Sequence, residues 1–298
     1  MMRRGLLVSA ACLACFCSVL GNAAPAADAS AKGVASPTTG PVGSPAIIPN
    51  AEQVDLRSKE GRDYRIFIAK PTGAPPPAGF PVLYMLDGNS VFGTAVDASR
   101  LQARALGPVV IVAVGYPVDT PFDGDRRYYD LTPKTDTSSF RQRLGREVAT
   151  GGRDEFLDFL VDRVRPLVEG RYKIDVKRQA LFGHSLGGQF VLHVMLSRPA
   201  LFQSYVAGSP SIWWNNRSLL QELPGFAAMP AETRGDLALK IIVGADELGH
   251  IVLDARNLVT SLPPMRAYYQ EIDDQSHVSM LPAAINSALQ FVLKSSHP

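Results

Sequence analysis

Residues 183–188 read Gly-His-Ser-Leu-Gly-Gly, directly after a short apolar run and directly before a helical pattern. A G-x-S-x-G sequence at such a junction is typical of a nucleophile elbow, a sharp turn that lifts a serine hydroxyl clear of a sheet. Gly183 and Gly187 are expected because Cβ atoms two residues from the strained serine would clash with neighbouring backbone. The pattern therefore predicts Ser185 as a nucleophile; the alternative is a purely structural glycine turn.

A serine nucleophile needs a base, and one histidine stands in the expected place. In this arrangement the residues follow in the chain order serine, acid, histidine. His277 follows the apolar run 265–272 and precedes a final helical pattern, which predicts a loop after the last strand. We predict that His277 takes and returns the serine proton, the alternative being an ordinary histidine on a surface loop.

The acid that would orient this histidine has two candidates. Glu247 stands three residues past Gly244, at the end of an apolar run, and this arrangement commonly places its acid there. Asp246 is the alternative, and a bystander role for both stays open. The aspartates at positions 273 and 274 lie too near the histidine in the sequence to be its usual partner.

Two backbone N–H groups should face the negative charge that develops on a carbonyl oxygen under attack. The first is expected from Leu186, which opens the helix after the elbow. The second is expected from the turn after the first long apolar run, where Gly88 permits close approach and Asn89 or Ser90 supplies the N–H. The alternative is that this turn is only a tight connection.

Short apolar runs that alternate with helical patterns must position these residues. Runs at 54–57 and 64–69 flank a polar turn and predict a hairpin. Apolar residues spaced three and four apart between 156 and 167 predict an amphipathic helix. Further runs have the bounded, apolar character of buried parallel strands, at 81–86, 109–114, 179–182, 203–207 and 237–243. The alternation predicts one α/β domain with a mostly parallel, doubly wound sheet, opened by the hairpin.

The polar stretch 116–152 interrupts this alternation. It is rich in Asp, Arg and Thr and is too long for a mere connection. We therefore predict that it forms a lid or a binding loop.

The beginning of the chain has the pattern of a secretory leader. Arg3 and Arg4 precede an uncharged apolar run at 6–20, and small residues follow it. This pattern predicts a signal peptide over residues 1–23, which would place the protein in the periplasm or, alternatively, outside the cell. No later run reaches the length of a membrane span, so no integral membrane segment is expected after leader removal.

Composition changes again after the leader. Residues 24–50 are rich in Ala, Pro, Ser and Gly, which predicts a flexible tether before a catalytic domain over 51–298. All three cysteines lie within the predicted leader, so disulfides are not expected in the exported chain.

The overall composition limits the function classes. The chain has 298 residues, of which 46% are hydrophobic, and this excludes a disordered or disulfide-scaffold protein. Its formal net charge is only +2. Because both excess charges are arginines of the predicted leader, the cleaved chain would be neutral. Such a balance gives no reason to expect a nucleic-acid partner.

Several narrower motifs span residues 84–277. They are Tyr84-Met-Leu-Asp-Gly88, Gly115-Tyr-Pro117, Arg127-Tyr-Tyr-Asp-Leu-Thr-Pro133, the elbow, Ser209-Pro-Ser-Ile-Trp-Trp214 and His277. Together they resemble the putative-esterase branch of the α/β-hydrolases, which contains esterase D, and within it the siderophore trilactone esterases for enterobactin, salmochelin and bacillibactin. The resemblance implies a single α/β-hydrolase domain and a serine carboxylic-ester hydrolase. It leaves the acid open, since some members work with a serine–histidine dyad.

The resemblance also implies substrate-binding residues. Arg127 falls where these esterases place an arginine at the mouth of the site. Guanidinium groups of Arg126 and Arg127 could pair with a ferric tris-catecholate, which is a trianion. The alternatives are a solvated basic pair or a salt bridge to Asp130. Trp213 and Trp214 could offer a face to a catechol ring, with one of the two expected to be buried packing.

The sequence thus predicts an exported serine esterase that hydrolyses the trilactone of a catecholate siderophore such as ferric enterobactin and so aids iron release. Its partner would be this small-molecule ester, and no metal or organic cofactor is expected for the chemistry. One alternative is a general carboxylesterase, a feruloyl-type esterase or an acyltransferase with the same residues. The other is a non-catalytic siderophore-binding protein on a hydrolase fold.

Overall fold

The computed structural model describes residues 46–138 and 145–294, so the predicted signal peptide and most of the predicted tether lie outside the described residues. Within these ranges, one eight-stranded sheet has the order β1-β2-β4-β3-β5-β6-β7-β8. The strands are β1 (Ala51–Arg57), β2 (Asp63–Ala69), β3 (Phe80–Leu86), β4 (Val110–Gly115), β5 (Ile174–His184), β6 (Ser204–Gly208), β7 (Ala238–Gly244) and β8 (Arg266–Ile272).

The pairing directions confirm the predicted mostly parallel sheet. β1 pairs antiparallel with β2, and β2 pairs antiparallel with β4, as a hairpin at the start of the sheet requires. From β4 to β8 all neighbours are parallel. Every residue of β3, β4 and β6 is buried, which explains why these strands appear in the sequence as uninterrupted apolar runs.

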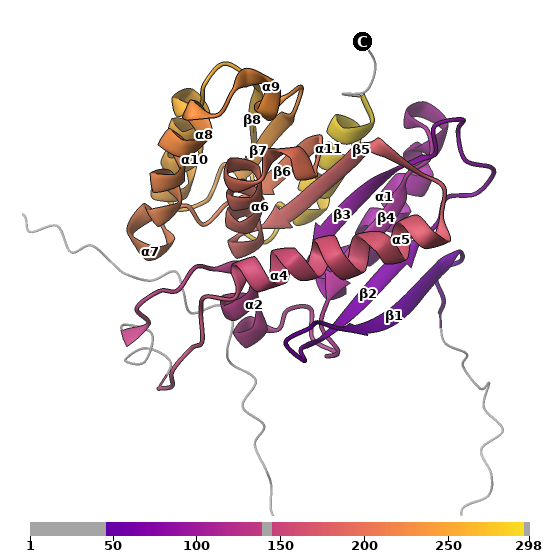
Figure 1. Ribbon diagram of the computed structural model, residues 1–298, viewed down its shortest axis with the longest axis horizontal. Helices are drawn as coiled ribbons and strands as arrows, with labels where there is room; N and C mark the ends of the chain where they lie inside the picture. Colours follow the sequence, from indigo (N-terminus) through magenta and orange to yellow (C-terminus); the bar gives the residue numbers. More distant parts are fainter. Residues whose placement is uncertain (1–45, 139–144, 295–298) are drawn as a thin grey trace, which may run out of the picture. The chain divides into compact units, whose positions relative to one another are not determined.

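Helices cover both faces of the sheet (Figure 1). One face packs against α1 (Gly88–Leu106) and α11 (Leu281–Lys294). The other packs against α4 (Arg153–Phe159), η1 (Leu160–Val164), α5 (Arg165–Arg171), α6 (Leu186–Ser197), α8 (Leu223–Ala228) and α10 (Gly249–Ser261). Shorter helices are α2 (Gly124–Leu131), η2 (Pro199–Leu201), α7 (Trp214–Arg217), η3 (Ser218–Glu222) and α9 (Ala231–Arg234).

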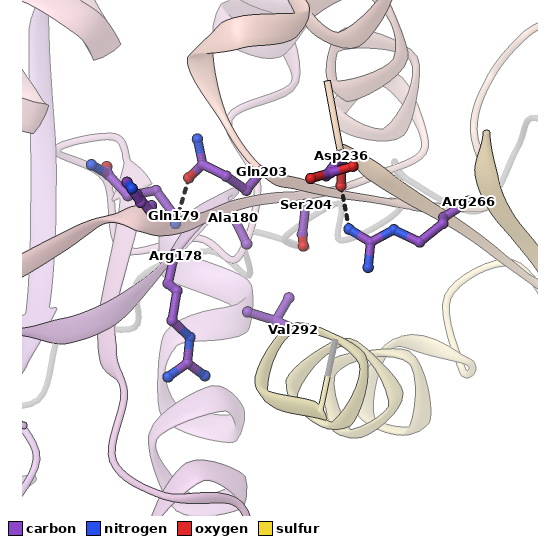
Figure 2. A pocket seen from close by; sticks show the side chains of 9 residues that line it. Arg178, Gln179, Ala180, Gln203, Ser204, Asp236, Arg266 and Val292 are labelled. Atoms are coloured by element: carbon purple, nitrogen blue, oxygen red, sulfur yellow. Dashed lines mark hydrogen bonds between the residues drawn. The ribbon is translucent and has the colours of Figure 1, made fainter. Parts of the chain in front are cut away.

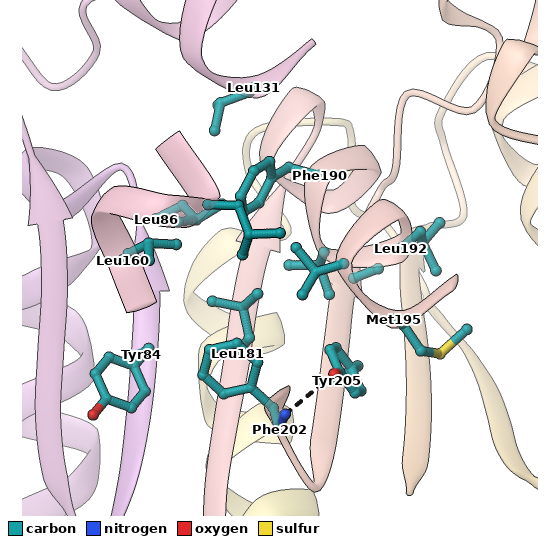
Figure 3. Close-up of a cluster of buried hydrophobic side chains, with 14 of the residues drawn as sticks. Tyr84, Leu86, Leu131, Leu160, Leu181, Phe190, Leu192, Met195, Phe202 and Tyr205 are labelled. Carbon is teal, nitrogen blue, oxygen red and sulfur yellow. Dashed lines mark hydrogen bonds between the residues drawn. The ribbon is translucent and has the colours of Figure 1, made fainter. Parts of the chain in front are cut away.

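The larger core fixes α6 against the centre of the sheet. Phe190 of α6, Leu181 of β5 and Tyr205 of β6 are fully buried in this cluster (Figure 3). Burying one such side chain contributes about 1.5–3 kcal/mol, so rotation of α6 away from the sheet would be costly. The helix that begins directly after Ser185 is therefore held rigidly.

Two segments differ from their sequence prediction. The helix expected over 156–167 extends from 153 to 171 and contains a π-helical turn, η1. The described part of 116–152 is not an open loop throughout, because it contains α2. Asp130, Leu131 and Thr132 at the end of α2 are almost completely buried, so this part is anchored to the body of the domain.

Candidate active site

The parallel strands bring the chemically important residues to one edge of the sheet. The elbow follows the carboxyl end of β5, Ser209 follows β6, Glu247 follows β7 and His277 follows β8. Because β5, β6, β7 and β8 are consecutive parallel neighbours, these four chain segments meet at the same edge.

Ser185, His277 and Glu247 form one hydrogen-bonded chain. His277 Nε2 lies 2.9 Å from Ser185 Oγ, and His277 Nδ1 lies 2.8 Å from Glu247 Oε2. These distances match the relation of nucleophile, base and orienting acid. Asp246, the alternative acid, is exposed, and Asp273 and Asp274 are exposed as well. The structure therefore brings together Glu247, and not its neighbour, with the histidine.

The carboxylate of Glu247 is buried and well supported. Its side chain has no exposed surface, its Oε1 accepts the Gly244 N–H at 2.8 Å, and it also accepts the hydroxyl of Ser209. Burial raises the pKa of Glu247, but the hydrogen bonds from His277, Ser209 and the Gly244 N–H outweigh it, so that the pKa lies below its ordinary value. Glu247 is thus ionised at neutral pH and can accept a hydrogen bond from the Nδ1–H of the imidazole.

The elbow combines a strained serine backbone with close backbone approaches that require two of its glycines. Ser185 has φ 60° and ψ −117°, a conformation that non-glycine residues rarely adopt. A Cβ atom at Gly183 would lie 2.3 Å from the carbonyl oxygen of Gly187, and one at Gly188 would lie 2.7 Å from that of Gly208. At Gly187 the nearest atom would be 3.5 Å away, an ordinary contact. The clash expected at Gly187 is therefore absent, and the close approaches are at 183 and 188.

Two helix beginnings supply candidate oxyanion donors. Leu186 is the first residue of α6, while Gly88 and Asn89 open α1. Among the described residues, the N–H groups of these three have no protein acceptor. The N–H of Ser90 instead donates to the Asp87 carbonyl at 2.8 Å. Ser90, the alternative to Asn89, is therefore not available as the second donor. Gly88 and Asn89 stay the predicted candidates for that donor.

The side chain of Asn89 locks the turn after β3 to the end of β4, a role that the sequence did not indicate. Its Oδ1 accepts the Tyr116 N–H at 2.9 Å, and its Nδ2 donates to the carbonyls of Tyr116 and Val118 at 3.0 and 2.8 Å. A Cβ atom at Gly115 would overlap Asn89 Oδ1, so glycine is required there.

The two arginines expected to bind an anionic substrate have protein partners instead. Arg127 Nε lies 2.6 Å from Asp87 Oδ1, and its Nη2 lies 3.1 Å from Asp87 Oδ2. Arg126 donates to Asp130 at 3.3 Å and to the Asp63 carbonyl at 3.0 Å. The side chain of Arg127 is only 13% exposed, and a buried guanidinium needs such a counter-charge. Arg127 thus fastens α2 to the turn after β3, and its anion-binding role stays a prediction.

The two tryptophans have different surroundings. Trp214 is 2% exposed, its Nε1 donates to Thr135 Oγ1 at 3.0 Å, and its ring stacks on Tyr128, as expected of the buried member of the pair. Trp213 is partly exposed, and its ring meets that of His250 edge-on, with the ring centroids 6.1 Å apart. Of the two tryptophans, Trp213 is thus the one that is partly exposed.

His184 of the elbow also contacts the loop after β8 that carries His277, a contact that no sequence pattern indicates. His184 Nε2 donates to the His277 carbonyl at 2.6 Å. Burial, together with the charges of His277 and Arg127, holds the pKa of His184 well below its ordinary range. A neutral His184 therefore positions the loop that carries His277.

A surface pocket lies away from these residues (Figure 2). It is lined by Arg178 and Gln179 of β5, Ser204 of β6 and Arg266 of β8. Ser204 and Arg266 begin their strands, so the pocket lies toward the opposite edge of the sheet from Ser185.

A family model described as "Putative esterase" matches residues 58–249. A ferri-bacillibactin esterase from Bacillus subtilis is 39% identical over 277 residues, which cover 88% of this chain and 96% of that protein. The chain belongs to the putative esterase family. It is a carboxylic-ester hydrolase.

Other known proteins are similar to this chain over much of its length. A siderophore triacetylfusarinine C esterase from Aspergillus fumigatus is 40% identical over 195 residues, covering 61% of this chain and 63% of that protein. The crystal structure of BES protein from Bacillus cereus superposes with a TM-score of 0.79 and 33% identity, covering 84% of this esterase and 98% of that chain. The expected α/β-hydrolase fold is thereby confirmed.

The described part of the esterase contains no group of three or more His, Cys, Asp or Glu residues that could hold a metal ion. In the same residues, no helix combines the length and the apolar character that a membrane span needs.

Proposed function

We propose that this esterase is an exported serine hydrolase that cuts the trilactone of a catecholate siderophore, such as ferric enterobactin. The chemistry rests on one observation, the contact of Ser185 Oγ with His277 Nε2 at 2.9 Å while Nδ1 faces the buried Glu247 carboxylate. This is the arrangement that activates a serine at neutral pH.

The reaction proceeds in two halves. Ser185 Oγ forms a bond to the ester carbonyl carbon while its proton passes to His277 Nε2, and the departing alcohol oxygen takes that proton. This leaves an acyl-enzyme on Ser185. Water then attacks the acyl carbon, gives a proton to His277, and the bond to Oγ breaks as Oγ regains a proton. The products are the alcohol and the acid of the original ester.

The oxyanion of each tetrahedral intermediate would be stabilised by the N–H groups of Leu186 and Asn89, or of Gly88. Their lack of protein acceptors and their place at the beginnings of α6 and α1 support this role. Glu247 keeps the imidazole oriented and stabilises its charged form.

The siderophore substrate is supported by the names of two relatives, a ferri-bacillibactin esterase and a triacetylfusarinine C esterase. The partly exposed Trp213, with His250 against its ring, is suited to contact a catechol ring. Opening of the trilactone would separate the catechol arms and weaken the chelation of iron, which is how cleavage would aid iron release.

Export is proposed from the sequence pattern of residues 1–23, with cleavage before the tether and action in the periplasm or outside the cell. Expression of the full chain in a Gram-negative host tests this part. Mass spectrometry should find a periplasmic protein that lacks these residues, whereas an uncleaved protein in the cytosol would contradict export.

Mass spectrometry of ferric enterobactin incubated with the esterase tests the substrate. We expect opened linear products with wild-type protein and intact trilactone with Ser185→Ala. Parallel incubations with triacetylfusarinine C and with a simple aryl ester separate the alternatives. Cleavage of the aryl ester alone would favour a general carboxylesterase, and failure of a fluorophosphonate to label the folded wild type would favour a binding protein.

A further inference from the structure

Ser211 lies beside the proposed nucleophile in the segment that follows β6. Its Oγ is 3.2 Å from Ser185 Oγ, and the residue is only 2% exposed. Its backbone is fixed on both sides, because its N–H donates to the Ser185 carbonyl at 3.0 Å and its carbonyl accepts the Trp214 N–H at 3.0 Å. The Ser211 hydroxyl is therefore held beside Ser185 Oγ, the proposed nucleophilic atom.

The direction of the Ser211–Ser185 hydrogen bond follows from the other members of the chain. Glu247 is ionised and can only accept, so in the neutral imidazole of His277, the form that acts as a base, the proton resides on Nδ1 and Nε2 is an acceptor. Ser185 consequently donates its single hydroxyl proton to Nε2. In its other contact, with Ser211 Oγ, Ser185 Oγ can therefore only accept, so Ser211 must be the donor.

The same short segment also contacts the acid. Ser209, two residues earlier, has a left-handed φ of 39° and donates its hydroxyl to Glu247. A Cβ atom at Gly188 would lie 2.7 Å from the Gly208 carbonyl oxygen and 3.0 Å from Pro210 Cα. The glycine at 188 thus lets α6 approach this segment closely, which brings Ser211 to the nucleophile.

We propose that Ser211 is a further catalytic residue whose hydroxyl donates a hydrogen bond to Ser185 Oγ. As the Ser185 proton passes to His277 and Oγ attacks the acyl carbon, negative charge grows on Oγ and the hydrogen bond strengthens. When the bond between Oγ and the acyl carbon breaks in the second half, Ser211 stabilises the departing oxygen until His277 returns the proton. The inference rests on the proposed function in taking Ser185 as the nucleophile.

Ser211→Ala tests this role with an aryl ester and with a fluorophosphonate, neither of which depends on the siderophore assignment. We expect kcat for the aryl ester and the second-order rate of labelling to fall about tenfold, the loss of one hydrogen bond that strengthens in the transition state. KM should change less than about twofold, because the hydroxyl acts on the reacting oxygen and not on bound substrate. Ser204→Ala, a buried serine at the opposite end of β6, is the matched control and should react at the wild-type rate.

Ser211→Cys tests the donor role of Ser211 if the alanine variant does not fold. A thiol is a weak donor of similar shape, so a folded cysteine variant should also label more slowly than wild type. Wild-type rates in either folded variant would overturn the role of Ser211. Failure of wild-type protein to cleave ferric enterobactin, with Ser211→Ala still slow on the aryl ester, would refute only the substrate.

Discussion

Glu247 and Asp246 are neighbouring acids with opposite surroundings. Glu247 has a fully buried side chain that accepts hydrogen bonds from His277, Ser209 and the backbone, whereas Asp246 is exposed. A carboxylate that holds the histidine in one tautomer affects the rate far more than one that faces water.

Replacement of these two acids should therefore have unequal effects. We expect Glu247→Gln to lower kcat for an aryl ester by about a thousandfold, since the amide would favour the wrong imidazole tautomer. Asp246→Asn should retain full activity. Steady-state kinetics of both variants provide the measurement, and a fully active Glu247→Gln would indicate a serine–histidine dyad.

The two outer glycines of the G-x-S-x-G motif should also behave differently. Gly183→Ala would place a Cβ atom 2.3 Å from the Gly187 carbonyl oxygen, and we expect it to lower the free energy of unfolding by at least about 2 kcal/mol. Gly187→Ala would make only ordinary contacts, the nearest with Leu86 at 3.5 Å, so its free energy of unfolding should stay within about 1 kcal/mol of wild type. Urea denaturation of both variants compares them, and equal losses would contradict this account.

Sequence patterns anticipate part of this site and omit part of it. The elbow motif and the order of residues along the chain predict Ser185 and His277 and narrow the acid to Glu247 or Asp246, because local turn geometry and strand ends determine where they lie. The bonds of Ser211 to Ser185 and of Arg127 to Asp87 join residues 26 and 40 positions apart. Such pairs depend on how segments pack, which no local pattern records.

At the scale of elements, Arg127 connects three of them. It lies on α2, forms an ion pair with Asp87 before α1, and its Nη2 lies 3.4 Å from the His184 carbonyl at the end of β5. The pair thus holds the turn that carries the proposed second oxyanion donor against the nucleophile elbow.

Loss of this ion pair should affect neutral and anionic substrates alike. Arg127→Met would leave the buried Asp87 carboxylate unpaired, and we expect a loss of about 3 kcal/mol in the free energy of unfolding. Addition of Asp87→Asn should recover part of that loss. In the single variant, kcat should fall by the same factor for a neutral aryl ester and for ferric enterobactin. A loss confined to KM of the anionic substrate would instead restore the binding role that the sequence suggested.

Helix α2 also carries a buried acid that links stability to pH. Burial, partly offset by Arg126, raises the pKa of Asp130 from 3.8 to about 6. Between these values the folded chain retains a proton that the unfolded chain releases. Stability should therefore fall as pH rises from about 4 to 6, by about 3 kcal/mol.

Asp130→Asn should remove this decline, because an amide does not titrate. Wild type should lose about 3 kcal/mol of its free energy of unfolding between pH 4 and pH 7 through Asp130, and the variant should not show this loss. Denaturant titrations at both pH values measure it. An unchanged difference would show that Asp130 does not cause the decline.

The sheet was more predictable than the segments that join it. Uninterrupted apolar runs mark the central strands, because these strands are buried on both faces. The π-helical turn η1 and the anchored end of α2 have no comparable signal. Both arise from packing against neighbours, and α2 in particular contains buried charged residues that resemble a solvated loop in the sequence.

At the scale of the whole molecule, two hydrophobic clusters lie on opposite faces of one continuous sheet. Neighbouring strands therefore share the same core, and none of the fully buried strands β3, β4 and β6 can leave without exposing apolar side chains on both faces. Because one continuous sheet is shared by both cores, the domain should unfold as a single cooperative unit.

Convergence of the site on one edge of the sheet makes enzymatic activity a reporter of global unfolding. The proposed catalytic groups follow the ends of β3, β5, β6, β7 and β8, so separation of any neighbouring pair of these strands would dismantle the site. On heating, the midpoint of residual activity should coincide with that of the circular dichroism transition, within about 2 °C. Inactivation well below the structural transition would reveal a part of the site that melts on its own.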